Sequence, residues 1–352
     1  MRRRAFLRLV ASFVALLPFA SPLSAADGAR VSGPIVYADL AIYLVHGSAA
    51  GGAVPLTLQD ALAKGQVKVR ETGSVNELTV ENVGNDEVFI QAGDIVKGGR
   101  QDRVLSVDLL LPPRSGEVSI AAFCVEHGRW TARGNEDGRQ FSSASSAMPS
   151  HEAMLAMRAH VGSGAALARD PTAAYESPAL AGRSQEKIWA TVKETQDSLT
   201  RSVGAPVAAP ASPSSLQLSL ENEKLKQAQA AYIGALQGAG ESGDDIVGYV
   251  FAINGKINSA DVYRSNALFR KMWRKLLAAN VTEAISEKDA AQAAPPSVKD
   301  VEAFLAAAET APEFERKLNA SVRLATRDGD SSLYAETRRA DGSWVHRNYL
   351  AK

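Results

Sequence analysis

One stretch, residues 95–130, constrains the fold more than any other. Its two segments 104–111 and 118–125 are apolar and rich in β-branched residues, and Pro112, Pro113, Ser115 and Gly116 lie between them. Apolar segments that flank turn residues are typical of a β-hairpin with a longer loop. If the loop 112–117 closes symmetrically, the antiparallel register places Leu111 opposite Val118, Leu105 opposite Cys124 and Arg103 opposite Glu126.

The open end of this hairpin is the predicted functional site. The candidate ligand-binding residues are Gly98, Gly99, Gln101, Asp102, Arg103, Glu126, Arg129, Trp130 and Gln185. Arg103 has two interpretations: a structural ion pair with Glu126, or an anion clamp that Glu126 orients. Glu126 and Asp102 are the candidate general acids or bases, although Asp102 also suits a turn in which it satisfies backbone groups.

The remaining residues of the stretch have structural alternatives too. Gly98-Gly99 suits a backbone with positive φ or a β-bulge, or alternatively a nest of backbone N–H groups that binds an anion. The pair is not part of a P-loop, because no Gly-Lys-Ser/Thr follows it. Arg129 and Trp130 suit either stacking on a ring or sugar, or anchoring of the hairpin. Cys124 is expected to be a small buried residue rather than a nucleophile. We expect no metal site and no cofactor, since His, Cys and acidic residues show no ligand spacing.

The first 26 residues predict a targeting segment. Arg2, Arg3, Arg4 and Arg8 precede or open an apolar run, 7–20, and Ser24-Ala25-Ala26 supplies the small residues of a cleavage site. Arg3-Arg4 followed by apolar residues favours twin-arginine export over the Sec route. The protein is then periplasmic or secreted, and no second apolar run is long enough to span a membrane. Removal of this segment leaves 35 basic and 39 acidic residues, a balance that argues against nucleic acid as a partner.

The rest of the chain predicts an α+β protein. Residues 30–200 hold a β-rich layer, a sandwich or half-barrel, that begins with a buried strand at 36–45, and a helix at 184–199. We expect a short helix at 57–64 capped by Thr57, and a mobile loop at 132–147. In the helix at 184–199, Gln185 and Trp189 are one turn apart, which suggests that the helix packs over the hairpin mouth with Gln185 reaching the polar cluster.

Residues 203–215, rich in Pro, Ala and Ser, predict a linker. The part beyond it, 216–352, predicts a helix at 216–236, a hairpin around Asn254-Gly255, a helix at 265–279, and a helix that Ser297 caps. A C-terminal antiparallel meander follows, with its turns at Asp328-Gly329 and Asp341-Gly342. We expect the two parts to pack as one domain, because neither repeats the motifs of the other.

Several strings resemble the ARG- and Rhodanese-Phosphatase-superfamily-associated protein domain. They are the G-G-R-Q-D-R string of residues 98–103, the F-C-V-E-x-G-R-W string of residues 123–130, Gln185 with Trp189, the later hairpin at 253–256, Asp261, and the helix with Trp273 and Leu276. The resemblance spans residues 30–350. The family has no established activity, and its name records neighbouring domains, among them ADP-ribosylglycohydrolases. The resemblance therefore implies a nucleotide- or ADP-ribose-like ligand only because such domains occur beside this one.

Three functional hypotheses follow. The first is an exported binding or sensing module for a small polar or anionic ligand. The second is a hydrolase that uses Glu126 or Asp102 as general acid or base while Arg103 or Arg129 stabilises charge. The third is a structural envelope protein whose motif residues only lock the hairpin. The sequence names no protein partner.

Overall fold

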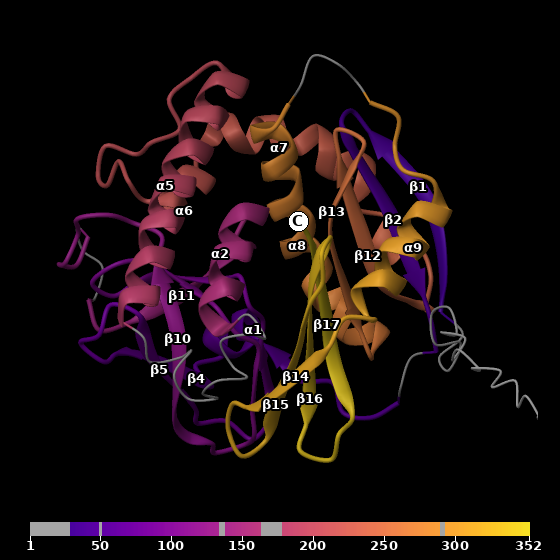
Figure 1. The fold of residues 1–352 in the computed structure, drawn as a ribbon. Helices are drawn as coiled ribbons and strands as arrows, with labels where there is room; N and C mark the ends of the chain where they lie inside the picture. The colour runs from indigo at the N-terminus through magenta and orange to yellow at the C-terminus, as the bar shows by residue number, and fades with distance from the viewer. Residues whose placement is uncertain (1–28, 49–50, 134–137, 163–177, 289–292) are drawn as a thin grey trace, which may run out of the picture.

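The computed structural model describes residues 29–48, 51–133, 138–162, 178–288 and 293–352, so the predicted targeting segment 1–26 lies outside the described residues. The fold is α+β, as predicted, and Figure 1 shows a curled N-terminal β part beside a large C-terminal sheet, with helices between and above them. Among the described helices, none combines the length and apolarity needed to cross a membrane.

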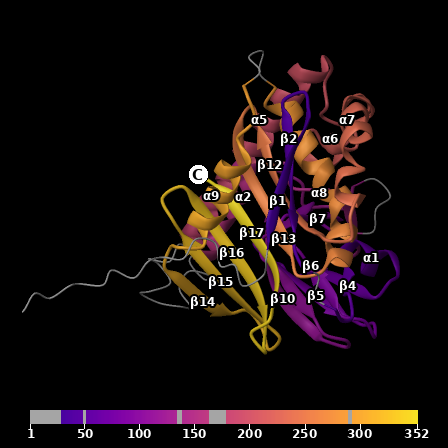
Figure 2. The ribbon, with the colours of Figure 1, turned by 90° about the vertical axis from the view of Figure 1, so that its right-hand side faces the viewer.

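The C-terminal sheet has eight antiparallel strands in the order β1-β2-β12-β13-β17-β16-β15-β14 (Figure 2). Two of them, β1 and β2, come from the beginning of the described chain, so this sheet joins residues about 300 positions apart. The strands are β1 (Arg30–Tyr37), β2 (Leu40–His46), β12 (Ile246–Ile253), β13 (Lys256–Tyr263), β14 (Glu313–Lys317), β15 (Val322–Asp328), β16 (Ser332–Arg339) and β17 (Trp344–Ala351).

The N-terminal part contains two smaller sheets. One has six strands in the order β11-β7-β8-β10-β5-β4, and the other has three in the order β3-β6-β9. Their strands are β3 (Leu56–Thr57), β4 (Val67–Glu71), β5 (Glu77–Asn82), β6 (Val88–Ile90), β7 (Asp94–Gly98), β8 (Arg103–Leu105), β9 (Leu109–Leu111), β10 (Gly116–Cys124) and β11 (Phe141–Ala147).

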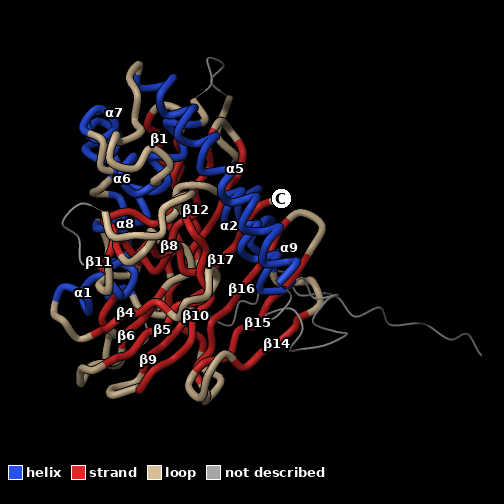
Figure 3. Tube along the Cα trace, turned by 90° about the vertical axis from the view of Figure 1, so that its left-hand side faces the viewer, coloured by secondary structure: helices blue, strands red, loops and turns tan. Residues whose placement is uncertain are grey.

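Helices join the two parts. Figure 3 shows α5 and α2 crossing the side of the molecule above the N-terminal strands. The helices are α1 (Leu58–Ala63), α2 (His151–Gly162), α5 (Pro178–Val203), α6 (Leu216–Leu220), α7 (Glu223–Leu236), the 3₁₀ turn η1 (Ala239–Glu241), α8 (Asn266–Ser286) and α9 (Val298–Ala308).

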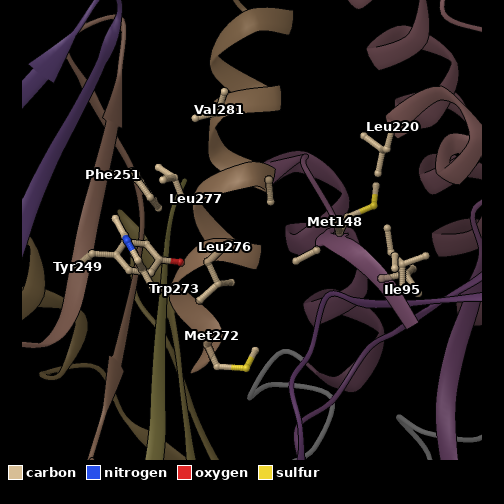
Figure 4. Packing of buried hydrophobic residues seen from close by; sticks show 14 of the residues in the cluster. Ile95, Met148, Leu220, Tyr249, Phe251, Met272, Trp273, Leu276, Leu277 and Val281 are labelled. Carbon is tan, nitrogen blue, oxygen red and sulfur yellow. The ribbon is translucent and has the colours of Figure 1, made fainter. Parts of the chain in front are cut away.

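Helix α8 fills the space between the large sheet and the N-terminal part. Its Trp273 is fully buried and stacks on Phe251 of β12, with ring centroids 6.2 Å apart. Figure 4 shows other α8 side chains between β12 and a group that contains Met148 and Ile95. Burial of aromatic and aliphatic side chains on both faces of α8 therefore holds the two parts together.

The register of the first hairpin differs from the prediction. Arg103 pairs with Cys124 and Leu105 with Ala122, two positions away from the predicted partners. The symmetric loop is wrong because β9 leaves the hairpin and pairs with β6 instead, while the first half of β10 pairs with β5. The physical reason lies at Asp108, whose carboxylate accepts the Ala92 N–H at 2.8 Å and draws this segment toward the loop after β6.

Three other expectations are wrong in detail. The buried strand expected at 36–45 is present as β2, but it begins only at Leu40, because residues 38–39 form the turn from β1, with Ala38 at φ 52°. The expected loop 132–147 ends in strand β11, which pairs with β7 even though its Ser-rich sequence lacks β propensity. The helix expected at 216–236 is two helices, because Asn222 caps the second one by accepting the N–H groups of Lys224 and Leu225.

Local turn and cap signals are confirmed. Thr57 and Ser297 each form a capping box, whereas Ser265, expected as the first residue of a helix, is instead the N-cap of α8. Asn254 and Gly255 both have positive φ in the turn from β12 to β13. The C-terminal meander is present as β15, β16 and β17. These features depend on a few adjacent residues, which is why short sequence patterns identify them.

Candidate functional site

The residues that the sequence singled out come together in one buried group. We call Gln101, Asp102, Arg103, Glu126, Arg129 and Arg133 the motif cluster; the first four are at most 1% exposed, and the Arg129 and Arg133 side chains are at most 10% exposed. They come from the turn between β7 and β8 and from the segment that follows β10. Arg133 was not predicted, because it lies in a Gly-rich segment without periodicity.

Asp102 is bound on every side. Its carboxylate accepts Arg133 Nη1 at 2.9 Å, Ser215 Oγ at 2.8 Å and the Gly98 N–H at 2.9 Å. Arg129 Nη2 lies 3.7 Å away. Both carboxylate oxygens therefore have hydrogen-bond partners. Asp102 fastens the turn between β7 and β8 through Gly98 and links this turn to the segments that contain Arg133 and Ser215.

Glu126 is equally occupied. It accepts Arg129 Nε at 2.7 Å, the Asp102 N–H at 3.1 Å and the hydroxyl of Ser212. Burial alone would raise the pKa of Glu126, but the hydrogen bonds from Arg129 and Ser212 outweigh it and lower the pKa. A carboxylate held ionised and fully bonded is a poor proton donor at neutral pH.

The predicted pairing of Arg103 with Glu126 is wrong. Arg103 Nη1 donates to Gln101 Oε1 at 3.3 Å, and its Nη2 lies 3.5 Å from Glu71 Oε2. The cause is the register: Glu126 lies beyond the end of β10, where the chain has turned toward Arg129. The guanidinium also lies 5.9 Å from the ring centroid of Trp130, which is 47% exposed.

Gly98 and Gly99 have the positive φ that the sequence suggested, at 120° and 55°. An added Cβ would lie 2.5 Å from the Gln140 carbonyl oxygen at Gly98 and 2.2 Å from the Phe141 ring at Gly99. The backbone here therefore packs closely against β11, and glycine is required by geometry.

Helix α5 packs over the mouth of the hairpin, as predicted. The Gln185 amide donates to the Cys124 carbonyl at 2.9 Å and accepts the Cys124 N–H at 2.8 Å, in the manner of a neighbouring strand. Trp189 Nε1 donates to the Glu126 carbonyl at 3.2 Å. The Cys124 thiol is buried, and burial raises its pKa to about 11, which does not favour a nucleophile.

The segment 203–215 also contacts the motif cluster. Ser212 and Ser215 bond Glu126 and Asp102, Ser214 bonds the backbone of His127, and the Leu216 N–H donates to the Val125 carbonyl at 3.0 Å. We call residues 203–215 the strap. Both carboxylates of the motif cluster thus hold the strap against the hairpin.

A second polar group, which the sequence analysis missed, lies between the two parts of the molecule. We call Asp108, Arg158, Asp261 and His346 the polar centre; each is at most 8% exposed. His346 lies between the two carboxylates, with Nδ1 2.7 Å from Asp108 Oδ2 and Nε2 3.0 Å from Asp261 Oδ1. These residues come from the segment before β9, from α2, from β13 and from β17, which are far apart in the sequence, so no short sequence pattern contains them. The available signal was a charged residue inside otherwise apolar segments, as in V-D-L-L-L at 107–111.

Two members of the polar centre, His346 and Asp108, are both charged at neutral pH. Burial would lower the pKa of His346, but the charge of Asp108 and the hydrogen bonds to both carboxylates raise it to about 9. Burial would likewise raise the pKa of Asp108, and the charge and hydrogen bond of His346 instead lower it to about 2. The imidazole of His346 is therefore protonated at neutral pH and lies between Asp108 and Asp261.

Arg158 is incompletely bonded. Its Nη2 donates to Asn348 Oδ1 at 3.2 Å, whereas Nε and Nη1 are buried without a hydrogen-bond partner. Asn348 lines a cavity of about 40 Å³ beside it, a volume that holds roughly three waters. The polar lining includes Gln91, Ser150, His151, Tyr249, Asn258, Ser259, Asp261, Asn280, Glu283 and Asn348.

Glu283 adds a titratable group to this cavity. It is buried on α8 and accepts the His151 N–H at 2.6 Å. Burial raises its pKa to about 7, against the effect of that hydrogen bond. The cavity therefore combines convergent polar groups with a carboxyl group that titrates near neutrality, and Arg158 reaches its wall through Asn348.

Comparison with known proteins identifies one family. Its model, described as the ARG and Rhodanese-Phosphatase-superfamily-associated Protein domain, matches residues 28–350. No curated protein and no solved structure matches the chain. The match spans the motif cluster, the strap and the polar centre together.

Proposed function

The chain belongs to the ARG and Rhodanese-Phosphatase-superfamily-associated Protein domain family, and from that premise we propose that it is an exported binding or sensing protein for a small polar ligand. We assign the ligand to the cavity beside the polar centre. The observation that carries this proposal is Arg158, whose Nε and Nη1 are buried without an acceptor. Leaving buried charged donors unpaired costs several kcal/mol, and a ligand with acceptor atoms would remove that cost.

The size of the cavity narrows the ligand class. A volume of about 40 Å³ accommodates only a few non-hydrogen atoms, so an enclosed ADP-ribose or nucleotide does not fit the proposal.

We propose a structural role for the motif cluster. Its two carboxylates already accept hydrogen bonds from arginines, backbone N–H groups and the strap. This supports a role in holding the strap against the hairpin, which we call a lock, rather than a role in binding a ligand. The same bonds argue against the alternative in which Glu126 or Asp102 is the general acid or base of a hydrolase, since such a group needs a proton at an accessible oxygen.

Replacing Arg158 with glutamine tests the binding proposal. Small molecules released by denaturing the purified mature protein would be identified by mass spectrometry for the wild type, for Arg158→Gln and for the control Arg274→Gln on the exposed side of α8. We expect a molecule in about stoichiometric amount with the wild type and the control, and at least a tenfold loss with Arg158→Gln. Equal recovery from all three proteins would contradict the proposal.

Export by the twin-arginine route is a separate part of the proposal, supported by Arg3-Arg4 and the apolar run after them. Changing both residues to lysine should stop the full-length protein from reaching the periplasm, because lysine pairs do not replace this signal. Cell fractionation followed by immunoblotting measures the result. Undiminished export of the Lys-Lys variant would favour the Sec route.

A further inference from the structure

A second hollow adjoins the cavity and has a different chemistry. It has a volume of about 230 Å³, and shares Ser150 and Glu283 with the cavity. Its wall comes from α2, α5, α8 and the residues just outside their ends. The lining consists of one proline, Pro149, four glutamates, Glu152, Glu194, Glu283 and Glu287, and five hydroxyl residues, Ser150, Thr191, Thr195, Ser198 and Ser286. We call this space the acidic hollow.

The negative charge of the acidic hollow is poorly compensated. No Lys, Arg or His belongs to its described lining. Glu152 pairs with Lys187 at 3.0 Å, but both side chains are more than half exposed, and such pairs stabilise little. Within the described residues, the Glu194 and Glu287 side chains have neither a hydrogen bond nor an ion pair. Burial raises the pKa of Glu287, as do the charges of Asp39 and Glu152, and the charge of Lys256 only partly offsets them.

An independent feature of the wall also requires a partner. Thr191 of α5 lines the acidic hollow and is 5% exposed, and its Oγ1 is buried without a hydrogen-bond partner. A helical threonine hydroxyl commonly bonds a carbonyl of the preceding turn, and here it does not. An unsatisfied buried hydroxyl costs about 1–3 kcal/mol, so a ligand that reaches Oγ1 would gain free energy.

We propose that the ligand of this protein carries a primary ammonium group, which binds in the acidic hollow, and a hydrogen-bond acceptor at its other end, which enters the adjoining cavity lined by Asn348, the hydrogen-bond partner of Arg158. This inference rests on the proposed function and names the class of its ligand: small amino acids, amino amides and related amines. An ammonium group has three donors, which suits carboxylates and hydroxyls spread around one space. Its charge would also relieve the repulsion among the glutamates.

A metal ion fits the acidic hollow less well. The described residues contain no set of three or more His, Cys, Asp or Glu side chains placed to hold a metal ion. Metal–oxygen bonds of about 2.0–2.6 Å require such a set to converge closely. A volume of about 230 Å³ lined by five hydroxyl residues suits an organic cation with several non-hydrogen atoms.

Calorimetric titration of the mature protein tests the inference with matched probes. The amine probes are 4-aminobutanamide and 4-aminobutanoate, and the controls are butanamide, which lacks the amine, and Mg²⁺. We expect the amine probes to bind with at least tenfold higher affinity than butanamide. The double variant Glu194→Gln/Glu287→Gln should weaken that binding at least tenfold. Asp197→Asn, an exposed acid on the same helix, should leave it unchanged.

The outcomes separate the two proposals. Amine binding that is weakened by both the double variant and Arg158→Gln supports both. A co-purifying molecule without an amine, lost with Arg158→Gln and retained by the double variant, would overturn the ammonium inference and leave the proposed cavity standing. Amine binding that Arg158→Gln leaves unchanged would overturn the cavity assignment. Saturable Mg²⁺ binding that depends on Glu194 and Glu287, without amine binding, would replace the ammonium by a metal ion.

Discussion

Asp102→Asn is expected to lower the free energy of unfolding by about 3–5 kcal/mol, the cost of breaking one side of a buried ionic group. The substitution keeps the size of the side chain but removes its charge, and turns one acceptor into a donor that faces Arg133 Nη1. Ser215 of the strap would lose its acceptor in the same step. Urea unfolding of the wild type and the variant, followed by circular dichroism, measures the difference.

The matched control is Glu117→Gln on strand β10. Glu117 accepts Arg70 Nη1 at 2.7 Å, but its side chain is 60% exposed, so its removal should cost less than about 1 kcal/mol. If Asp102→Asn also cost less than about 1 kcal/mol, the motif cluster would not be a lock, and a ligand-binding role for it would become the better account.

The second large effect concerns the polar centre and pH. The pKa of His346 is about 9 in the folded protein, above its unfolded value of 6.5. Its contribution to stability is therefore fully present below pH 6.5 and is lost as pH rises toward 9, an effect on the order of 3 kcal/mol. Asp108 acts at acidic pH: its contribution to the free energy of unfolding is present above about pH 3.8 and is lost as pH falls toward 2.

Urea unfolding at pH values from 4 to 9.5 measures the loss of stability that His346 causes. The pKa of Glu283 is raised to about 7, so the folded protein holds a proton there that the unfolded chain has already released. Glu283 therefore lowers the free energy of unfolding between about pH 4.5 and 7, at lower pH than the loss caused by His346. Glu283→Gln removes that slope and serves as the background for His346→Gln. Adding His346→Gln should abolish the decline between pH 6.5 and 9, and lower stability at pH 6 by about 3–5 kcal/mol. An unchanged alkaline slope would mean that His346 is neutral in the folded protein.

The sequence predicted features that depend on neighbouring residues. The caps at Thr57 and Ser297 and the turn at Asn254-Gly255 each follow from a short pattern with a local physical cause, and the α+β class follows from the order of such patterns along the chain. The gathering of the Gly98–Arg103 and Glu126–Trp130 segments also followed, because two strands joined by a loop bring their far ends together. These predictions required no knowledge of distant contacts.

What the sequence did not predict depends on long-range contacts. The hairpin register failed because Asp108 bonds the chain after β6, and the serine-rich β11 forms because β7 offers it an unpaired edge. The role of the strap in binding Asp102 and Glu126 is not visible in a Pro/Ala/Ser composition. The polar centre combines residues 108, 158, 261 and 346, so only the folded chain reveals it.

A high-resolution crystal structure of the mature protein, as purified and without added ligands, tests the ligand site most directly. The account predicts continuous density larger than a water molecule in the cavity, within hydrogen-bond distance of Arg158 Nε and Nη1 and extending toward Glu283. Separate water molecules alone, with Arg158 fully bonded to them, would contradict it, because hydration would then satisfy the guanidinium and leave no reason to assign a ligand there.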